Sequence, residues 1–436
     1  MIPLEADILI ENCTVLPMDG RDIIEDGLVA TKKNIITYAG PKRKAPKIEA
    51  DKTIDAVGMA ATPGLINCHT HLAMTLFRGV AEDQPLETWL TEAIWPLEAK
   101  LKPQDIYYGS LLGCLEMMKS GTTCFADMYF HEETVAEAVQ EAGLRAVLAP
   151  GLLETLDKDL AEETLKQTVH LVKKYHKPES TIKIQLGPHA VYTCSLDFLK
   201  RVRETATRHK IGVHIHLAES KDMANQIEKE HDQTEAQLLE SIDFLGSDVL
   251  AAHCIHLSRE DMRTLAKHDV KIVYNPVANM KLAQGTAKIP DLQKLGLTVS
   301  LGTDGPASNN TLDMLQNMKI AALLQKAHYG DPTVLPAKTV LEMATRNAAK
   351  ALGLERTIGS LELGKRADIA LIDFKKPHLT PQHNPYANIV YSANGSDVQT
   401  LIVDGKVLME NREVKTLDED EIMEKARETA LNLLKR

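Results

Sequence analysis

Short apolar or β-branched runs recur eight times between residues 61 and 304, and segments of helix length separate most of them. This alternation predicts an α/β fold, a (β/α)8 TIM-like barrel. An open doubly wound sheet is the alternative. Polar residues gather at the C-terminal ends of the runs, where a barrel builds its active site, and they favour the barrel. The runs are ATPGLIN (61–67), TTCFADM (122–128), RAVLAPGL (145–152), IKIQLGPH (182–189), GVHIHLAE (212–219), VLAAHC (249–254), VKIVYNP (270–276) and LTVSLGTD (297–304), and helices are expected over 134–142, 195–209, 222–240 and 258–268.

The two ends of the chain have a different pattern from this middle part. Both are rich in strand-forming runs, and the Asp404-Gly405 step is typical of a hairpin. We therefore predict a small β-sandwich domain built from both chain ends. Its parts are residues 1–57 and residues 363–436, the latter with a polar helix over about 418–435, and residues 58–362 form the barrel.

Composition excludes several classes of protein. Lys and Arg number 50 against 61 Asp and Glu, and the net charge of −11 argues against a nucleic-acid binder, which needs a basic face. No stretch approaches 18 uncharged apolar residues, so no membrane span is expected. The segment Met1–Asp7 carries acids where a signal peptide needs basic residues. The six cysteines form no C-x-x-C pair, which indicates reduced thiols and a cytoplasmic protein.

Histidines occupy two of the predicted strand ends in pairs. The first strand ends in His69-Thr70-His71, and because side chains alternate along an extended segment, both imidazoles face one point. The fifth strand carries His214 and His216. We predict that His216 is a metal ligand because it lies nearer the C-terminal mouth, whereas His214 lies deeper.

Three further polar residues belong to the same predicted rim. His253 closes the sixth strand, Asp304 lies between glycines at the end of the eighth, and Glu219 follows the fifth. Imidazole and carboxylate groups in this number suit Zn²⁺, with Fe²⁺ or Mn²⁺ as alternatives. A metal with an open position lowers the pKa of a bound water to about 7, and a nearby carboxyl group moves protons. The pattern predicts metal-assisted hydrolysis.

These segments resemble the amidohydrolase superfamily over nearly the whole chain. The resemblance is carried by PGLINCHTHL (63–72), HIHLAES (214–220), LAAHC (250–254), NPVANMKLAQG (275–285), SLGTDGPASNN (300–310) and GSLELGKRADIALID (359–373). Within the superfamily, the chain is most similar to the deaminases of methylthioadenosine, S-adenosylhomocysteine and 5′-deoxyadenosine. TLFRG (75–79), LETWLTEAIWPLEAKL (86–101) and GPHAVYTCS (187–195) carry this closer similarity.

The resemblance implies a role for each candidate site residue. It implies the metal ligands His69, His71, His216 and Asp304, the catalytic residues Glu219, His253 and Asp304, and the substrate contacts Glu98, His189, Glu219, Asp304, Trp89 and Ser308. Considered alone, Glu98 is more typical of a solvated helix face and Trp89 of core packing. Binuclear relatives carry a lysine at the end of strand 4, but here Lys183 lies near its start. One divalent metal per subunit is therefore expected.

The implied reaction is hydrolytic deamination of an adenine nucleoside, a small-molecule substrate. Water gives its proton to His253 and Asp304, the resulting hydroxide attacks C6, Glu219 protonates N1, and ammonia leaves. The alternatives are another amidohydrolase, such as a guanine or cytosine deaminase or a triazine hydrolase, and a non-catalytic scaffold. Enzymes of this kind are commonly dimers or tetramers, so a homo-oligomer is expected.

The segment after strand 3 bears on the 5′ substituent of the substrate. Relatives that prefer S-adenosylhomocysteine place arginines there, but residues 151–165 contain none and carry Glu154, Asp157, Asp159, Glu162 and Glu163. A substrate carboxylate would find no guanidinium partner and would meet like charge. We therefore predict that 5′-deoxyadenosine and methylthioadenosine are turned over at least as efficiently as S-adenosylhomocysteine.

Overall fold

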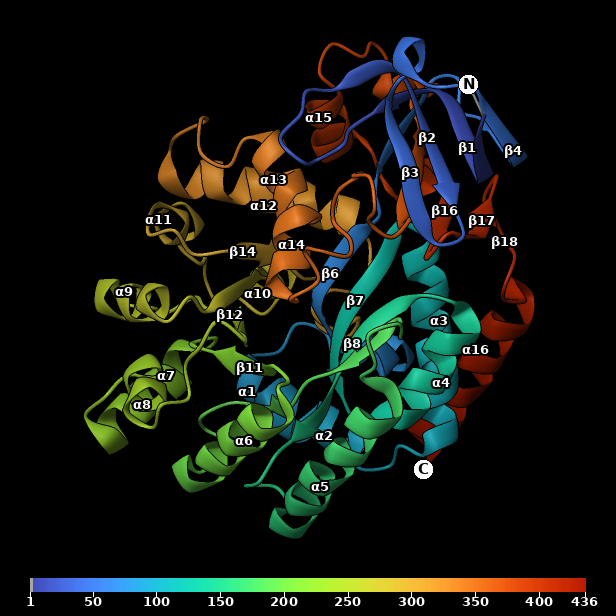
Figure 1. Cartoon of the computed structure of the whole chain (residues 1–436). Coiled ribbons are helices and arrows are strands. Elements are labelled where there is room, and N and C mark those ends of the chain that lie inside the picture. Colours follow the sequence, from blue (N-terminus) through green and yellow to red (C-terminus); the bar gives the residue numbers. More distant parts are fainter. Residues whose placement is uncertain (1–2) are drawn as a thin grey trace.

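Strands from the two chain ends lie side by side in the computed structural model, which describes residues 3–436 (Figure 1). They form one sheet in the order β18-β17-β16-β15-β5-β1-β2-β3, with β4 paired to β1. Both chain ends therefore contribute strands to one sheet, and the β-sandwich domain stays a prediction. The strands are β1 (Leu4–Val15), β2 (Ile24–Lys32), β3 (Ile35–Pro41), β4 (Ile48–Asp55), β5 (Met59–Pro63), β15 (Ile369–Asp373), β16 (Val398–Val403), β17 (Lys406–Glu410) and β18 (Glu413–Val414).

Alternation along β1 explains how this sheet covers its core. Ala6, Ile8 and Ile10 are buried, while the residues between them are more exposed, as expected for a strand with one covered face. The prediction that Met1–Asp7 is not part of a signal peptide partly concerns Met1 and Ile2, which lie outside the described residues.

The eight predicted central runs all contain strands, and these strands are parallel. One sheet has the order β10-β8-β7-β6, with β9 paired to β8, and the other has the order β11-β12-β13-β14. Nearly every residue in them is buried, which explains their continuous apolar character. The strands are β6 (Leu65–Thr70), β7 (Thr122–Tyr129), β8 (Arg145–Leu152), β9 (Ile182–Ile184), β10 (Gly187–Pro188), β11 (Val213–Leu217), β12 (Val249–His253), β13 (Lys271–Tyr274) and β14 (Val299–Leu301).

Backbone hydrogen bonds join the two sheets on both sides. An isolated bridge pairs Leu186 with Val213, and the His216 amide donates to the His189 carbonyl over 2.9 Å. On the other side, the Asp304 amide donates to the His69 carbonyl over 2.9 Å. The arrangement is a TIM-barrel-type α/β fold, and it brings the C-terminal ends of β6, β11, β12 and β14 to a common rim.

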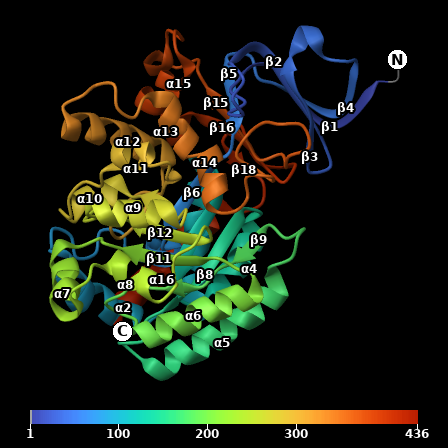
Figure 2. The ribbon, with the colours of Figure 1, turned by 60° about the vertical axis from the view of Figure 1, so that its left-hand side comes forward.

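Helices surround these strands and follow most of them (Figures 1 and 2). The predicted helix over 222–240 is two helices, because Asp232 ends the first in a left-handed conformation and the Thr234 side chain caps the second. Among the described residues, no helix combines the length and apolarity needed to cross a membrane. The helical segments are η1 (Lys42–Lys44), η2 (Leu72–Phe77), α1 (Leu86–Thr88), η3 (Trp89–Ile94), α2 (Trp95–Glu98), α3 (Pro103–Lys119), α4 (Glu132–Ala142), α5 (Lys158–Tyr175), α6 (Leu196–His209), α7 (Lys221–His231), α8 (Glu235–Ser241), α9 (Arg259–Lys267), α10 (Pro276–Lys281), α11 (Ile289–Lys294), α12 (Met314–Tyr329), α13 (Ala337–Met343), α14 (Arg346–Ala351), η4 (Pro377–Leu379), α15 (Pro385–Ala387), η5 (Asn388–Ser392), η6 (Gly395–Asp397) and α16 (Glu419–Lys435).

A buried ion cluster fastens the shared sheet to the start of the barrel strands. The Arg145 guanidinium, at the first residue of β8, donates to both carboxylate oxygens of Asp368 over 2.9 and 3.1 Å and to Asp404 over 3.1 Å. At the C-terminus, α16 packs on α3, and the Arg436 guanidinium binds the Asp105 carboxylate. The Arg145 cluster holds the sheet at the end of the central strands that lies opposite the rim with the histidines.

Candidate metal centre and nucleoside cavity

Four strand ends bring a compact group of nitrogen and oxygen atoms together at the rim. Ring nitrogens of His69, His71 and His216 all lie within 4.8 Å of one another, and so do single ligand atoms of His69, His253 and Asp304. These side chains are buried or nearly so. The structure therefore collects at one point every residue that the sequence predicted as a metal ligand.

Hydrogen bonds on the far side of each ring orient the three histidines. The Nδ1 atoms of His71 and His216 donate to the carbonyls of Met128 (2.6 Å) and His189 (2.9 Å). Nδ1 of His69 is 2.9 Å from Nε2 of His214. Each of the three rings is thus held by Nδ1 and presents Nε2 to the centre, which is how histidine ligands are commonly oriented. His214 lies behind His69, as predicted.

Asp304 completes the group with a carboxylate. Its Oδ1 lies 3.3 Å from Nε2 of His69 and 3.1 Å from Nε2 of His71. Burial raises the pKa of Asp304, but the two adjacent imidazoles of His69 and His71 outweigh it and hold that pKa well below its usual range. Oδ2 accepts a hydrogen bond from Ser308 Oγ over 2.8 Å. The structure therefore places Ser308, a predicted substrate contact, directly against the carboxylate.

Two glycines beside Asp304 allow this close approach. A Cβ atom on Gly302 would lie 2.8 Å from Cβ of His69, and one on Gly305 would lie 2.7 Å from Sδ of Met74. Neither position has room for a side chain unless its neighbours move. The glycines that flank Asp304 are therefore needed to bring the end of β14 against the end of β6.

This donor set fits a divalent metal. Burial lowers the pKa of His69 to about 4, so this imidazole is neutral and able to coordinate. Its Nε2 is buried and makes no hydrogen bond of normal geometry within the protein. Three imidazoles and one carboxylate are typical zinc ligands. Lys183 lies elsewhere, on β9, where its Nζ donates to the carbonyls of Lys177 and Pro178.

Strand ends at this rim leave ordinary β geometry. Ala218, His253 and Asp304 have φ values of 49°, 72° and 65°, in the left-handed region that residues other than glycine seldom adopt. Strained backbone of this kind concentrates at functional sites, because the surrounding structure must hold it there. Here it turns Glu219, His253 and Asp304 toward one cavity.

Glu219 and His253 lie close together beside the candidate metal site. Nε2 of His253 is 3.7 Å from Oε1 of Glu219, and Nδ1 of His253 is bonded to Oδ1 of Asn279 over 2.9 Å. Asn279 Oδ1 can only accept, so Nδ1 carries a proton and Nε2 of the neutral ring is free to accept one. Burial raises the pKa of Glu219, which favours its protonated form. Asn279 was not identified as a site residue, although it lies in the quoted motif NPVANMKLAQG.

A cavity that encloses about 650 Å³, including its opening, lies over these groups, and predicted substrate contacts line it. Trp89 lies in the π-helical turn η3, and Glu98 ends α2. Burial raises the pKa of Glu98 to about 7. Burial and neighbouring histidines lower the pKa of His189 to about 3, and its Nδ1 lies 3.0 Å from Thr193 Oγ1. The cavity therefore joins the candidate metal site to every predicted substrate contact.

Two tyrosines in this cavity were missed by sequence reasoning. The hydroxyl groups of Tyr129 and Tyr192 are buried and have no hydrogen-bond partner of normal geometry in the protein. Both residues line the cavity. The only sequence signal was their position beside a strand end, in TTCFADMYF and in GPHAVYTCS, where an aromatic residue is also typical of core packing.

Comparison with known proteins decides the family. The amidohydrolase family profile matches residues 60–408. This chain belongs to the amidohydrolase family. A 5-methylthioadenosine/S-adenosylhomocysteine deaminase from Desulforudis audaxviator is 49% identical over 429 residues, which cover 98% of this amidohydrolase and 99% of the relative. A 5′-deoxyadenosine deaminase from Methanosarcina acetivorans is 48% identical over 433 residues, 99% of each chain.

Solved structures agree with this family assignment. An adenosine deaminase from Xanthomonas campestris with bound zinc superposes on this amidohydrolase with a TM-score of 0.96, at 30% identity and over 100% of both chains. Atrazine chlorohydrolase from Arthrobacter aurescens, complexed with zinc, gives a TM-score of 0.88 at 26% identity, over 97% of this chain and 100% of that one. The predicted resemblance to the amidohydrolases is therefore confirmed.

Proposed function

We propose that this amidohydrolase catalyses the metal-dependent hydrolytic deamination of adenine nucleosides derived from S-adenosylmethionine, giving the inosine analogue and ammonia. One observation carries the proposal: a candidate metal site and the Glu219–His253 pair share one cavity with the Glu98 carboxyl. The deaminase relatives at 48–49% identity and the zinc-bound adenosine deaminase structure support the same reaction.

A single divalent metal, Zn²⁺ by preference, would be held by His69, His71, His216 and Asp304, and it would act as a Lewis acid that makes a water nucleophilic at neutral pH. Lys183 lies away from the site, which supports one metal per subunit rather than two.

Proton transfers are assigned to three side chains. His253 Nε2, free to accept, takes the proton of the attacking water together with Asp304. Glu219, whose pKa burial raises, gives its proton to N1 as the water oxygen bonds to C6. Asp304 then passes a proton to the amino group, the proton of the C6 hydroxyl returns to Glu219 as the C6–N6 bond breaks, and ammonia leaves the inosine product. General acid–base groups of this kind each contribute about 10²–10⁴-fold to a rate.

The ribose end is assigned to the opposite wall. Glu98, when ionised, accepts hydrogen bonds from ribose hydroxyl groups. His189 presents Nε2 to the cavity, because Thr193 Oγ1 occupies its Nδ1. Trp89 packs against the nucleoside. We expect 5′-deoxyadenosine and methylthioadenosine to be turned over at least as efficiently as S-adenosylhomocysteine.

Several broader features belong to this proposal. The eight central strands close into a barrel, and the chain divides near residues 57 and 362 into the barrel and a β-sandwich. The enzyme is cytoplasmic, which the six unpaired, buried cysteines support, and it is a homodimer or homotetramer.

An ammonia-release assay on the zinc-loaded protein tests the reaction. The panel contains 5′-deoxyadenosine, methylthioadenosine, S-adenosylhomocysteine and adenosine, with guanine, cytosine and atrazine as the substrates of alternative activities. We expect ammonia from the nucleosides and a much lower kcat/KM for guanine, cytosine and atrazine. Turnover of one of these three alone would replace the proposed substrate class, and no turnover at all would favour a non-catalytic scaffold.

A further inference from the structure

A groove continues from the nucleoside cavity toward the surface. It encloses about 1940 Å³ including its opening and runs between the end of α2, the start of α4 and helix α5. The groove and the cavity share six residues, so a ligand in the cavity can extend into the groove: Trp95, Glu98, Tyr129, Phe130, Gly151 and Leu153. Because Glu98 is assigned to the ribose, the part of a nucleoside that enters the groove is its 5′ substituent.

Two buried polar groups in the groove wall have no partner. The Tyr129 hydroxyl and Oε2 of Glu132 belong to residues that are 4% and 2% exposed, and neither atom makes a hydrogen bond of normal geometry within the protein. Both residues line the groove. The other carboxylate oxygen of Glu132 accepts a hydrogen bond from the Tyr129 amide over 3.0 Å. An unsatisfied buried hydroxyl is costly in a folded protein, so a polar ligand that reaches the Tyr129 hydroxyl from the groove would stabilise it.

The charges that line the groove are of one sign. Among the described residues, its lining includes five acids, Glu98, Glu132, Glu133, Glu137 and Asp157, but no lysine or arginine. Lys174 pairs with Glu133 over 2.7 Å from outside the groove, and Glu137 on α4 is exposed and forms no ion pair among residues 3–436. Burial raises the pKa of Glu98 to about 7 and that of Glu132 well above its usual range, so most of the negative charge comes from Glu133, Glu137 and Asp157. The field of these three carboxylates favours a cation in the groove.

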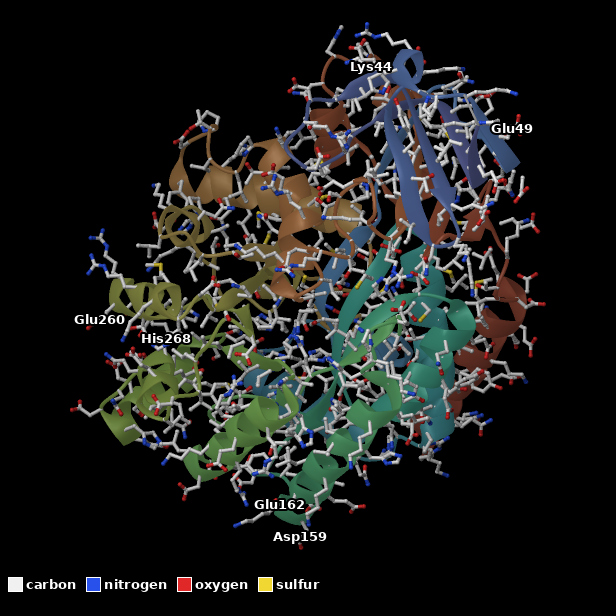
Figure 3. The ribbon with its side chains drawn as sticks, viewed as in Figure 1. Lys44, Glu49, Asp159, Glu162, Glu260 and His268 are labelled. Carbon is white, nitrogen blue, oxygen red and sulfur yellow. The ribbon has the colours of Figure 1, made fainter. Side chains whose placement is uncertain are left out.

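The acids expected to repel a carboxylate are mostly not in this groove. Of the five acids between 154 and 163, only Asp157 lines it. Glu154 accepts a hydrogen bond from the Ser195 amide, and Glu162 pairs with Arg201. Asp159 and Glu162 lie near the outer end of α5 (Figure 3). Most of the acidic side chains in the groove lie instead on α4, which sequence reasoning did not connect with the 5′ side.

Aromatic side chains form the entrance to the groove. Trp95, Tyr129 and Phe130 lie where the cavity meets the groove, so they surround the position of the first atoms beyond C5′. Aromatic faces attract ammonium and sulfonium cations. Leu156 and Leu160 on the α5 side are about half exposed and offer apolar surface to a hydrocarbon linker.

We propose that this groove binds a cationic 5′ substituent, so that the enzyme prefers adenine nucleosides whose 5′-thioether or sulfonium chain ends in an amine and lacks a carboxylate. The proposal rests on the proposed deaminase function and specifies its substrate class. A carboxylate in the groove would meet like charge and no guanidinium or ammonium partner, whereas an amine would meet carboxylates and aromatic faces.

Three synthetic thioethers of equal chain length test the proposal. They are 5′-S-(3-aminopropyl)-5′-thioadenosine, its 3-carboxypropyl counterpart and the uncharged 5′-S-propyl compound, compared by kcat/KM on the zinc-loaded protein. We expect the amine to exceed the carboxylate by at least about tenfold, with the propyl compound between them, and added salt to narrow the difference. Equal values, or a preference for the carboxylate, would overturn the proposal.

A charge-reversal pair localises the effect. Glu137→Lys changes the groove lining, while Glu204→Lys makes the same change of charge on the exposed face of α6, outside the groove. We expect Glu137→Lys to reduce the amine-to-carboxylate ratio about three- to tenfold and Glu204→Lys to leave that ratio unchanged. An equal reduction in both variants would mean that overall charge, not the groove, sets the preference, and it would overturn the proposal.

The same experiment separates failure of the groove proposal from failure of the deaminase proposal. If 5′-deoxyadenosine and all three thioethers release no ammonia, the deaminase proposal fails. Calorimetric binding of the three thioethers to the zinc-loaded protein then judges the groove by itself: the order amine, propyl, carboxylate supports it, and any other order contradicts it.

Discussion

Substitution of Ser308 tests whether this residue supports the Asp304 carboxylate, as the structure indicates, or contacts the substrate. Its hydroxyl donates to Oδ2 of Asp304 over 2.8 Å, leaving Oδ1 toward the histidines. A hydrogen bond to a charged group contributes about 1.5–3 kcal/mol. If Ser308→Ala removes this bond from the metal-bound form, zinc affinity should fall by about 10- to 100-fold, since 1.4 kcal/mol corresponds to about tenfold.

Zinc affinity is measured by competition with a chromophoric chelator, alongside kcat and KM for methylthioadenosine. Ser110→Ala is the matched control, because Ser110 is also buried but its hydroxyl has no hydrogen-bond partner to lose. We expect Ser110→Ala to bind zinc like the wild type. A Ser308→Ala variant with normal zinc affinity and a raised KM would refute the reasoning and show that Ser308 contacts substrate, as the sequence predicted.

Four further outcomes follow from the site and the fold. Glu219→Gln should retain zinc by metal analysis but lose about 10²–10⁴-fold in kcat, and loss of the metal would contradict its role as a proton donor. Chelation should abolish activity and one equivalent of zinc per chain should restore it, whereas a requirement for two would contradict a mononuclear site. Because burial raises the pKa of Glu98 to about 7 and the ionised form accepts the stronger ribose hydrogen bonds, kcat/KM should rise as pH increases through about 7, and Glu98→Gln should abolish this rise. Arg145→Met should lower the free energy of unfolding by about 3–5 kcal/mol in urea titrations, since it leaves the buried Asp368 carboxylate without its partner; an unchanged midpoint would contradict this.

The strand ends were predictable because two simple periodicities fix them. Buried parallel strands appear as continuous apolar runs, and side chains two residues apart share a face, so His69 and His71 could be assigned to one point without coordinates. The helices were less predictable. The segment 222–240 was expected as one helix, but Thr234 and Gln237 form a capping box that starts a second one.

The groove could not be predicted, because its chemistry depends on contacts between distant elements. Glu133 and Glu137 have the pattern of a solvated helix face, and only the position of α4 beside α5 turns them toward a ligand channel. Tyr129 is buried, as is typical of an aromatic residue at a strand end. No local pattern shows that its hydroxyl lacks a partner, since this depends on what each surrounding strand and helix presents.

Asp304 shows how a structural and a functional interpretation of one motif can both hold. Between two glycines at a strand end, an aspartate is typical of a turn, and Asp304 does adopt a left-handed φ of 65°. That turn carries its carboxylate to within 3.3 Å of His69 and 3.1 Å of His71, and Gly302 and Gly305 leave room for the approach. The strained backbone therefore creates the ligand geometry. A residue that filled either glycine position would disturb the metal site even if the barrel still folded.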